Sequence, residues 1–255
     1  MGPSPSDVAF LLLLSLVTLY VQTYIFPFEQ PIELTDPSIR MPHKKDIVPS
    51  HTLLFASLLA PLAVFCAVEL RGLSSKRTLL LLFFTALFEG NLLTVLVTNV
   101  LKLLIGRPRP YFASVCVGYV AGSETQCTGD ADAVKEARKS FPSGHSSLAF
   151  SAAIFLACYL GTKFGIGKAS STTQSWKICA VLVPPFFAAL VAASRIVDFH
   201  HHYADILAGS VLGASIALFV FYGRSPAMIK LKDAKEDADL GAPVHGYDSV
   251  AVSEV

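Results

Sequence analysis

Long apolar runs dominate this chain and restrict the structures open to it. A bilayer core of roughly 30 Å needs about 20 predominantly apolar residues in a helix. Backbone groups in lipid must be satisfied within the segment, which favours helices. Six runs meet or approach this length, at residues 8–26, 52–70, 79–101, 146–160, 178–197 and 206–222. The fourth run is short and reaches a spanning length only if His145 and Gly161 extend it. We therefore predict an all-α fold, a bundle of six transmembrane helices.

The composition supports a single membrane domain with short polar ends. Only 15% of the residues are charged, against about 25% in a typical soluble protein. The net charge of +1, with no basic stripe, gives no basis for nucleic-acid binding. The first run has Asp7 and no basic residue before it, so we interpret it as a retained span rather than a signal peptide. We expect residues 1–7 to be a cytoplasmic N-terminus, 8–222 the membrane domain, and 223–255 a disordered cytoplasmic tail.

The distribution of Lys and Arg between the runs predicts an orientation. The second connection holds Arg71, Lys76 and Arg77 with no acid, and the fourth holds Lys163 and Lys168 with no acid. Because cytoplasmic connections are enriched in Lys and Arg, these two are predicted to be cytoplasmic, as are both termini. The first, third and fifth connections then face the lumen or the exterior, although the third also carries several cations.

Three short strings lie at run ends on the predicted luminal or extracellular side. They are Lys102 with Arg109-Pro110, then Pro142-Ser143-Gly144-His145, then Ser194-Arg195 with His201 and Asp205. Arg offers a planar fork to phosphate oxygens and Lys a compact charge, so Lys102, Arg109 and Arg195 are candidate phosphate ligands. The alternative is that they are anchors reaching toward lipid headgroups. Arg107 is a further candidate that spacing does not rank.

The second string combines a helix start with a titratable group. Ser143 suits the N-cap of the following helix, whose first backbone N–H groups lack partners. A helix start beside Gly144 binds anions readily, and His145 is placed to protonate a leaving alkoxide as general acid. The alternative is an ordinary helix cap followed by an unrelated histidine.

The third string contains a candidate nucleophile. His201 and Asp205 are four residues apart, which on a helix places them on one face. Asp205 would then accept the N–H of His201 and fix its tautomer, leaving the other nitrogen free to attack phosphorus and form a phosphohistidine. The alternative is a pair of interfacial polar residues. Neighbours in a helix point about 100° apart, so we expect no metal site from three consecutive histidines, and His200 and His202 would support the site or face solvent.

Two further groups of residues bear on the site. Cys116 and Cys127 lie in the third connection, on the predicted oxidising side, where either a disulfide or two unpaired thiols would fit. Glu89 stands near the middle of the third run, where ionised groups are costly. It lies roughly 20 Å along a helix from Lys102 and is left out of the catalytic set.

Taken together, the three strings resemble the signatures of the lipid phosphate phosphatases of the type-2 phosphatidic acid phosphatase superfamily. Their order, their spacing and the six runs agree with that family over residues 8–222. The resemblance implies a membrane enzyme, independent of magnesium and without a cofactor. Its substrates would be phosphatidate, lysophosphatidate, diacylglycerol pyrophosphate or sphingoid phosphates. It also implies a nucleophile at His201 assisted by Asp205, a general acid at His145, and phosphate binding by Lys102, Arg109, Ser143, Gly144 and Arg195.

Other functions compete with this interpretation. A sphingoid-phosphate- or prenyl-diphosphate-specific phosphatase would fit the same scaffold. A non-catalytic protein that binds lipid phosphates would also fit, but such relatives usually lose a histidine that this chain retains. A channel or transporter would explain the runs and leave the strings unexplained. The preferred lipid, the membrane (plasma membrane or an endomembrane such as endoplasmic reticulum or vacuole) and any homo-oligomer are left open by the sequence.

Overall fold

The computed structural model describes residues 3–33, 35–69, 77–116, 127–167 and 174–239, with side chains described as far as Pro226. Every regular element in these residues is helical. In chain order they are α1 (Pro5–Tyr24), a short 3-10 helix (Pro37–Ile39), α2 (Ser50–Glu69), α3 (Arg77–Ile105), α4 (Phe112–Cys116), α5 (Ala131–Ala137), α6 (Gly144–Phe164), α7 (Ser175–Val197) and α8 (Tyr203–Asp239). Six are long and apolar enough to cross a membrane: α1, α2, α3, α6, α7 and the Tyr203–Pro226 part of α8. The predicted all-α fold with six spans is confirmed.

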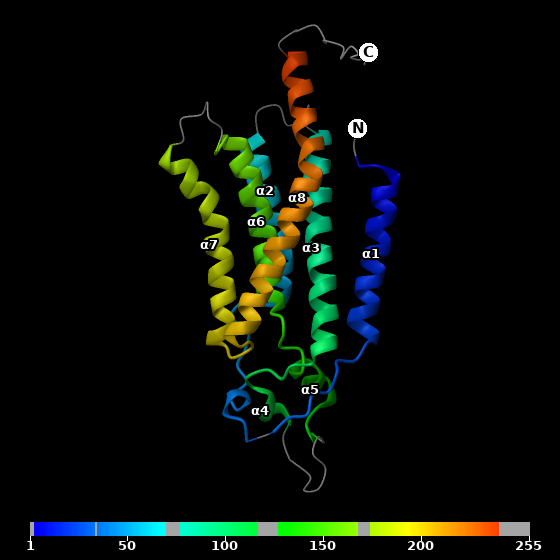
Figure 1. Cartoon of the computed structure of the whole chain (residues 1–255), viewed down its shortest axis with the longest axis vertical. Helices are drawn as coiled ribbons and strands as arrows, with labels where there is room; N and C mark the ends of the chain where they lie inside the picture. The colour runs from blue at the N-terminus through cyan, green and yellow to red at the C-terminus, as the bar shows by residue number, and fades with distance from the viewer. Residues whose placement is uncertain (1–2, 34, 70–76, 117–126, 168–173, 240–255) are drawn as a thin grey trace, which may run out of the picture.

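The long helices run side by side around α6 (Figure 1). Helix α6 packs against α2, α3, α7 and α8, and α1 packs against α3. The α6 sequence is rich in Ser, Ala and Gly, and such small residues let helix backbones approach closely in a membrane. Helix α1 begins and α8 ends at one end of the bundle, while α4, α5 and the connection before α2 lie at the other. We call these the terminal end and the site end.

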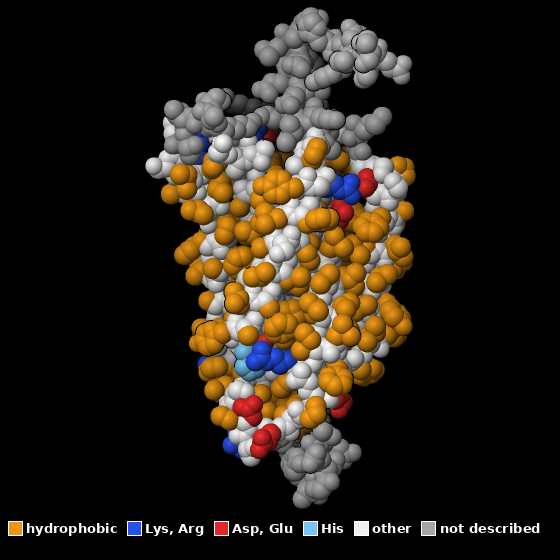
Figure 2. Space-filling model, viewed as in Figure 1, with side chains coloured by type: hydrophobic (Ala, Val, Ile, Leu, Met, Phe, Trp, Pro, Cys, Tyr) orange, Lys and Arg blue, Asp and Glu red, His pale blue; other side chains and the backbone are white. Residues whose placement is uncertain are grey.

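The outer surface of the bundle is apolar. Figure 2 shows hydrophobic side chains covering the flank of the helices, with charged side chains gathered toward the two ends. Among the exposed large hydrophobic residues are Leu12, Phe55, Leu182, Phe186 and Phe219, from α1, α2, α7 and α8. Because the exposed band follows the six apolar helices, it matches a surface that faces lipid rather than water.

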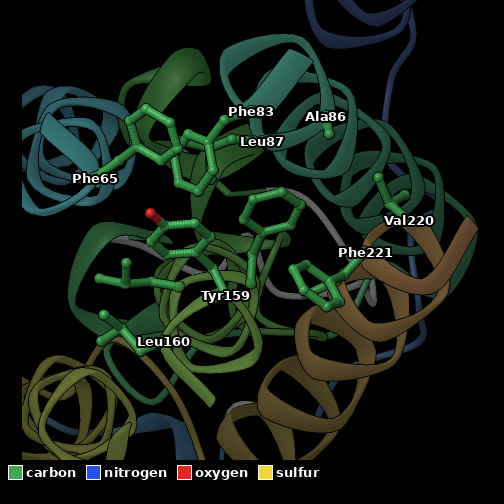
Figure 3. Packing of buried hydrophobic residues seen from close by; sticks show 11 residues of the cluster. Phe65, Phe83, Ala86, Leu87, Tyr159, Leu160, Val220 and Phe221 are labelled. Atoms are coloured by element: carbon green, nitrogen blue, oxygen red, sulfur yellow. The ribbon is translucent and has the colours of Figure 1, made fainter. Parts of the chain in front are cut away.

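The interior toward the terminal end is an aromatic cluster (Figure 3). It joins Phe65 of α2, Phe83 of α3, Phe155 and Tyr159 of α6, and Phe221 of α8. The rings of Phe65 and Phe83 are stacked with centroids 4.4 Å apart. Lipid tails are as apolar as these side chains, so the cluster stabilises the bundle through close packing more than through transfer from water.

Ion pairs tie the helices together near the terminal end. Arg224 of α8 donates to Glu89 of α3 from Nε (3.0 Å) and from a terminal nitrogen (2.8 Å), and its other terminal nitrogen donates to Asp7 of α1 (2.9 Å). Glu89 is therefore hydrogen-bonded at a part-buried position between α3 and α8. Arg224 was expected to open a free tail, yet it still belongs to the spanning part of α8.

Two glycines bring the helices to the geometry of the site end. Gly106 ends α3 in the left-handed region, with φ of 62°, and a Cβ there would overlap the carbonyl group of Phe28. Glycine adopts this conformation without steric cost. On α8, a Cβ at Gly209 would lie only 2.5 Å from the carbonyl oxygen of Ser143. The start of α8 can therefore lie directly against the start of α6.

Some expectations about the ends and connections differ from the structure or fall outside it. Helix α8 continues to Asp239, beyond the predicted span end at 222, because residues 227–239 are mostly strong helix formers such as Ala, Leu, Met, Lys and Glu. The expected tail boundary at residue 223 therefore lies inside a helix. Arg71, Lys76 and Lys168, which carried much of the orientation argument, lie outside the described residues.

Candidate active site

The three sequence strings meet around one cavity at the site end. The cavity measures about 960 Å³ and is lined by six of the predicted site residues: Lys102, Arg109, Gly144, His145, Arg195 and His201. The other two, Ser143 and Asp205, are fully buried behind this lining. Residues separated by a hundred positions in the sequence are thus brought together, because α3 and α7 end, and α6 and α8 begin, at the site end of the bundle.

Ser143 and Gly144 form the start of α6. The Ser143 hydroxyl accepts from the backbone N–H of Ser146 (3.3 Å), and its own N–H donates to the carbonyl of Asp205 (2.9 Å). A Cβ added to Gly144 would lie 3.6 Å from the amino nitrogen of Lys102. A lysine ammonium therefore lies beside a helix N-terminus, and both favour a bound anion.

Arg109 is held at the cavity by the small platform formed by α4 and α5. Its backbone N–H donates to the carbonyl of Ala137 (2.8 Å), and a terminal nitrogen of its side chain pairs with Glu136 (2.5 Å). Burial acts to raise the pKa of Glu136, but the charges of Arg109 and Lys102 hold that pKa below its usual range. The Nε of Arg109 is buried without a partner, so one donor of this guanidinium is still available.

Arg195, near the end of α7, is completely buried. One terminal nitrogen pairs with Asp46 (2.8 Å) and Asp198 (2.6 Å), and the other donates to the carbonyl of Val48 (3.2 Å). Its Nε also has no partner. An unpaired buried donor is costly, and here the two orphaned Nε atoms belong to the two arginines that line the cavity.

His201 precedes α8 instead of lying on it. The chain turns between α7 and α8, with Phe199 at φ of 61° and the N–H of His201 bonded to the carbonyl of Arg195 (3.2 Å). The premise that His201 and Asp205 share a helix face is therefore wrong. The Nδ1 of His201 lies 2.7 Å from the carbonyl of Ser140 and 3.7 Å from Asp205.

The contact with Ser140 defines the tautomer of His201. A carbonyl oxygen only accepts, so Nδ1 carries the proton and Nε2 keeps its lone pair. Burial lowers the pKa of His201 from its ordinary 6.5 to about 3, against the opposing effect of Asp205. The imidazole is therefore neutral at physiological pH, which is the form that acts as a nucleophile.

Asp205 is the centre of a buried hydrogen-bond network. It accepts from Arg107 (2.7 Å), from the Ser140 hydroxyl (2.6 Å) and from the backbone N–H of His202 (2.9 Å), and Nδ1 of His202 lies 3.2 Å away. Its side chain is fully buried. Asp205 therefore fixes the loop that carries His201 through several partners, and the Ser140 carbonyl takes the place expected for Asp205.

His145 faces the cavity from the first turn of α6. Its Nε2 lies 2.9 Å from the carbonyl of Val48, which also accepts from Arg195. Nε2 thus carries a proton in this conformation. A general acid also needs a proton on Nδ1, so that the ring is an imidazolium and becomes neutral when Nε2 gives up its proton. The proton is directed at the chain just before α2.

His200 is buried and joins two acids. Its Nε2 lies 2.9 Å from Asp46 and its Nδ1 lies 3.1 Å from Asp198. Burial acts to raise the pKa of Asp198, but the hydrogen bond with His200 and the charge of Arg195 hold that pKa below its usual range. His200 therefore supports Arg195, whereas His202 is partly exposed beside Asp205.

Asp46, Asp198 and His200 form a group with metal-ligand chemistry among the described residues. Their ligand atoms lie within 4.8 Å of one another. The guanidinium of Arg195 contacts both acids, however, and each nitrogen of His200 already faces an acceptor. In this conformation Arg195 supplies the positive charge that a metal ion would bring.

A disulfide joins Cys116 and Cys127 beside the site. It connects the end of α4 to the segment before α5, within a small core that includes Ile39, Phe112 and Ala137. The ten residues between the two cysteines lie outside the described part of the chain. The link ties together the platform on which Arg109 rests.

Several residues of the site were missed by sequence reasoning or left unranked. Arg107 lies inside the first string, Ser140 stands two residues before the second, and Asp198 stands three residues after Arg195, so their positions gave some signal. Asp46 and Val48 gave none, because they precede α2 and reach Arg195 only through the fold.

The amino-acid sequence was compared with those of known proteins. Residues 78–228 match the profile described as the PAP2 superfamily. The chain is 32% identical to lipid phosphate phosphatase 2 of Arabidopsis thaliana over 83% of this chain and 74% of that protein. It is 34% identical to lipid phosphate phosphatase 1 of the same plant, over 72% of this chain and 56% of the relative. It is 31% identical to the probable diacylglycerol pyrophosphate phosphatase 1 of Schizosaccharomyces pombe, over 85% and 79%. No solved structure matches the chain.

Proposed function

The chain belongs to the PAP2 superfamily, and from this premise we propose that it is a multi-pass membrane phosphatase that hydrolyses phosphatidate and related lipid phosphates through a phosphohistidine intermediate. The observation that carries the proposal is the position and tautomer of His201. Its Nδ1 is bonded to the Ser140 carbonyl, it lines the cavity, and its Nε2 is left with a lone pair.

The proposed phosphate position is surrounded by fixed positive charge. Lys102, Arg109 and Arg195 all line the cavity with His201, and two of them have an unpartnered Nε. The start of α6 at Ser143 and Gly144 adds the positive end of a helix dipole. Charges placed in advance stabilise the electron density that builds on the phosphoryl oxygens during transfer.

Two steps complete the proposed reaction. In the first, Nε2 of His201 forms a bond to phosphorus as the phosphorus–oxygen ester bond breaks, and His145, in its imidazolium form, gives its Nε2 proton to the departing alkoxide and becomes neutral. In the second, water attacks the phosphohistidine and His145 takes up the proton, so that phosphate and free His201 are released. The same histidine serves as acid and then as base, as reversible proton transfer requires. Fixed cations supply the positive charge, so magnesium is not needed.

The cavity has an apolar wall that fits a lipid substrate. Pro49 just before α2, Leu53 of α2 and Leu148 of α6 line it together with the charged residues. Its volume of about 960 Å³ exceeds what a phosphate group fills, which leaves room for a glycerol or sphingoid portion. We therefore include phosphatidate, lysophosphatidate, diacylglycerol pyrophosphate and sphingoid phosphates as substrates.

The orientation follows from the same proposal. The site end would face the lumen or the exterior, where a disulfide such as Cys116–Cys127 persists, and both termini would be cytoplasmic. Protease treatment of sealed vesicles tests this. Cleavage in the 162–177 connection from the luminal side contradicts the orientation.

The central experiment is a substrate panel assayed in detergent with EDTA, using purified wild-type protein and the His201→Ala variant. Phosphate release from lipid phosphates by the wild type alone is expected, together with a labelled, acid-labile phosphoenzyme after rapid quenching. Prenyl diphosphates belong in the panel as the competing substrate class. A strict requirement for magnesium, or normal turnover by His201→Ala, contradicts the proposed mechanism.

A further inference from the structure

The segment immediately before α2 lies across the end of α7. We call residues 43–48 the strap. Lys44 donates to the carbonyl of Val197 (3.3 Å) and lies over the ring of Phe199, and the N–H of Ile47 approaches Asp198 at 3.4 Å. The strap also lines the cavity through His43, Lys44, Lys45 and Asp46. It lies outside the 78–228 region that matches the superfamily.

Two strap residues hold the groups that the proposed reaction needs. The carboxylate of Asp46 lies 2.8 Å from Arg195 and 2.9 Å from Nε2 of His200. Two residues later, the carbonyl of Val48 accepts from Arg195 (3.2 Å) and lies 2.9 Å from Nε2 of His145. The anionic oxygen of Asp46 thus contacts Arg195, a proposed phosphate ligand, and the neutral carbonyl oxygen of Val48 contacts His145, the proposed general acid.

These contacts resemble those of a phosphate ester in both charge and placement. A phosphoryl oxygen would bind Arg195 as a carboxylate does, through charge-assisted hydrogen bonds. The leaving oxygen would need the His145 proton that Val48 now accepts. A phosphate dianion bound to Arg195 and the Asp46 carboxylate on the same guanidinium would also repel each other. The strap and the substrate therefore compete for the same donors.

Exposure distinguishes the two acids on Arg195. The side chain of Asp198 is 1% exposed, whereas that of Asp46 is 34% exposed. Asp198 is fixed at the end of α7 and can remain as the permanent partner. Asp46 can turn out toward water, and the completely buried Arg195 then keeps Asp198 as its paired acid.

We infer that Asp46 determines substrate affinity: its carboxylate occupies the phosphate position on Arg195, and the substrate must displace the strap before His145 can reach the leaving oxygen. This inference rests on the proposed function for the identity of the substrate. The competition itself requires only that the site bind phosphate.

The test compares Asp46→Asn and Asp46→Ala with wild-type protein. The matched control is Glu33→Gln, which removes the same charge from an exposed position in the same connection. Two quantities are measured: the inhibition constant of inorganic phosphate against phosphatidate hydrolysis, and the rise in unfolding temperature that inorganic phosphate produces in the purified full chain. The second needs no turnover.

If Asp46 competes with phosphate, both variants bind phosphate about three- to tenfold more tightly. In both Asp46 variants the KM for phosphatidate and the inhibition constant of phosphate are lower than in the wild type, while kcat changes little. Glu33→Gln behaves as wild type. Weaker phosphate binding with a raised KM overturns the inference and makes Asp46 a support for Arg195. Unchanged phosphate binding overturns it as well.

The unfolding measurement separates this inference from the proposed function. If the wild type hydrolyses no lipid phosphate but phosphate stabilises Asp46→Asn more than wild type, the function fails and the competition stands. If lipid phosphates are hydrolysed and phosphate stabilises both proteins equally, the function stands and the competition fails. A variant that does not fold shows no cooperative unfolding transition, and Asp46→Ala then serves as the independent second substitution.

Discussion

The carbonyl oxygen of Ser140 lies 2.7 Å from Nδ1 of His201, a full ångström closer than the nearest oxygen of Asp205. The hydroxyl of the same serine donates to Asp205 over 2.6 Å. Ser140 therefore stands between the acid and the proposed nucleophile, and it connects them through its own backbone and side chain. This arrangement gives different expectations for substitutions at the three positions.

Replacing His201 by alanine tests the nucleophile. We expect kcat to fall by about three orders of magnitude or more, because no other described group offers a lone pair at that point of the cavity. The purified variant should still insert and show an unfolding transition. His51→Ala, an exposed histidine at the start of α2, is the control and should retain activity. Substantial turnover by His201→Ala contradicts the assignment.

Replacing Ser140 by alanine tests the bridge. The carbonyl remains, but Asp205 loses a buried donor, and we expect kcat to fall roughly 10- to 100-fold with KM little changed. The double variant with Asp205→Asn should be no worse than the more damaged single variant, since both substitutions break one network. Strictly additive losses in this cycle are the result that contradicts the bridge.

The two arginines of the first string should behave differently. Arg109 lines the cavity, so Arg109→Gln should raise KM for the lipid phosphate about 10-fold or more. Arg107 pairs with the buried Asp205, so Arg107→Gln should lower kcat and leave KM near the wild-type value. Arg107→Lys should recover part of the lost kcat. The kinetic constants of the three variants measure this directly, and a raised KM for Arg107→Gln rules out the distinction.

The depressed pKa of His201 predicts how stability depends on pH. In the unfolded chain this histidine takes up a proton near pH 6.5, whereas in the folded protein its pKa is lowered by burial to about 3. The unfolded state binds more protons between these values, so stability is present above pH 6.5 and is lost as pH falls toward 3. The loss approaches roughly 1.4 kcal/mol per pH unit.

Unfolding temperatures at pH 7.5 and pH 5 provide the measurement. The wild type should lose more stability between the two than His201→Gln, which has no imidazole to protonate. Because His201 stays neutral down to a pKa of about 3, its protonation should not cause a loss of kcat/KM with a midpoint near pH 6.5. Identical pH dependence in the two proteins contradicts the predicted burial.

Two glycines of α8 provide a matched pair for packing. A Cβ at Gly209 would press on the Ser143 carbonyl at 2.5 Å, whereas at Gly223 it would meet nothing within 4 Å. Gly209→Ala should therefore shift α8 away from the start of α6, lowering both kcat and the unfolding temperature. Gly223→Ala should be neutral or stabilise the helix by up to about 1 kcal/mol. A harmless Gly209→Ala contradicts the close approach.

Much of the bundle was predictable because each span is a local property. The third run was predicted at 79–101 and the helix spans Arg77–Ile105. The fifth was predicted at 178–197 and the helix spans Ser175–Val197. Hydrocarbon length and internal hydrogen bonding act on consecutive residues, so the errors are confined to helix ends. The largest lies in α8, where helix-forming residues continue beyond the apolar run.

The partners of the site residues were not predictable in the same way. The four-residue spacing of His201 and Asp205 suggested a direct helical pair, but the turn between α7 and α8 places the Ser140 carbonyl nearest to the imidazole. Glu89 appeared isolated in the third run, yet it pairs with Arg224, 135 positions away. No local pattern encodes such contacts.

By itself the sequence determined that this chain forms six apolar helices and carries three strings of phosphate-binding residue types at their ends, because run length, backbone hydrogen bonding and residue chemistry act along the chain. Only the tertiary structure decided which donor meets which acceptor: His201 donates to Ser140, Arg107 to Asp205, and Arg195 to Asp46. Hydrogen bonds and ion pairs depend on fractions of an ångström and on direction. These are set by how the helices pack and where the connections cross them.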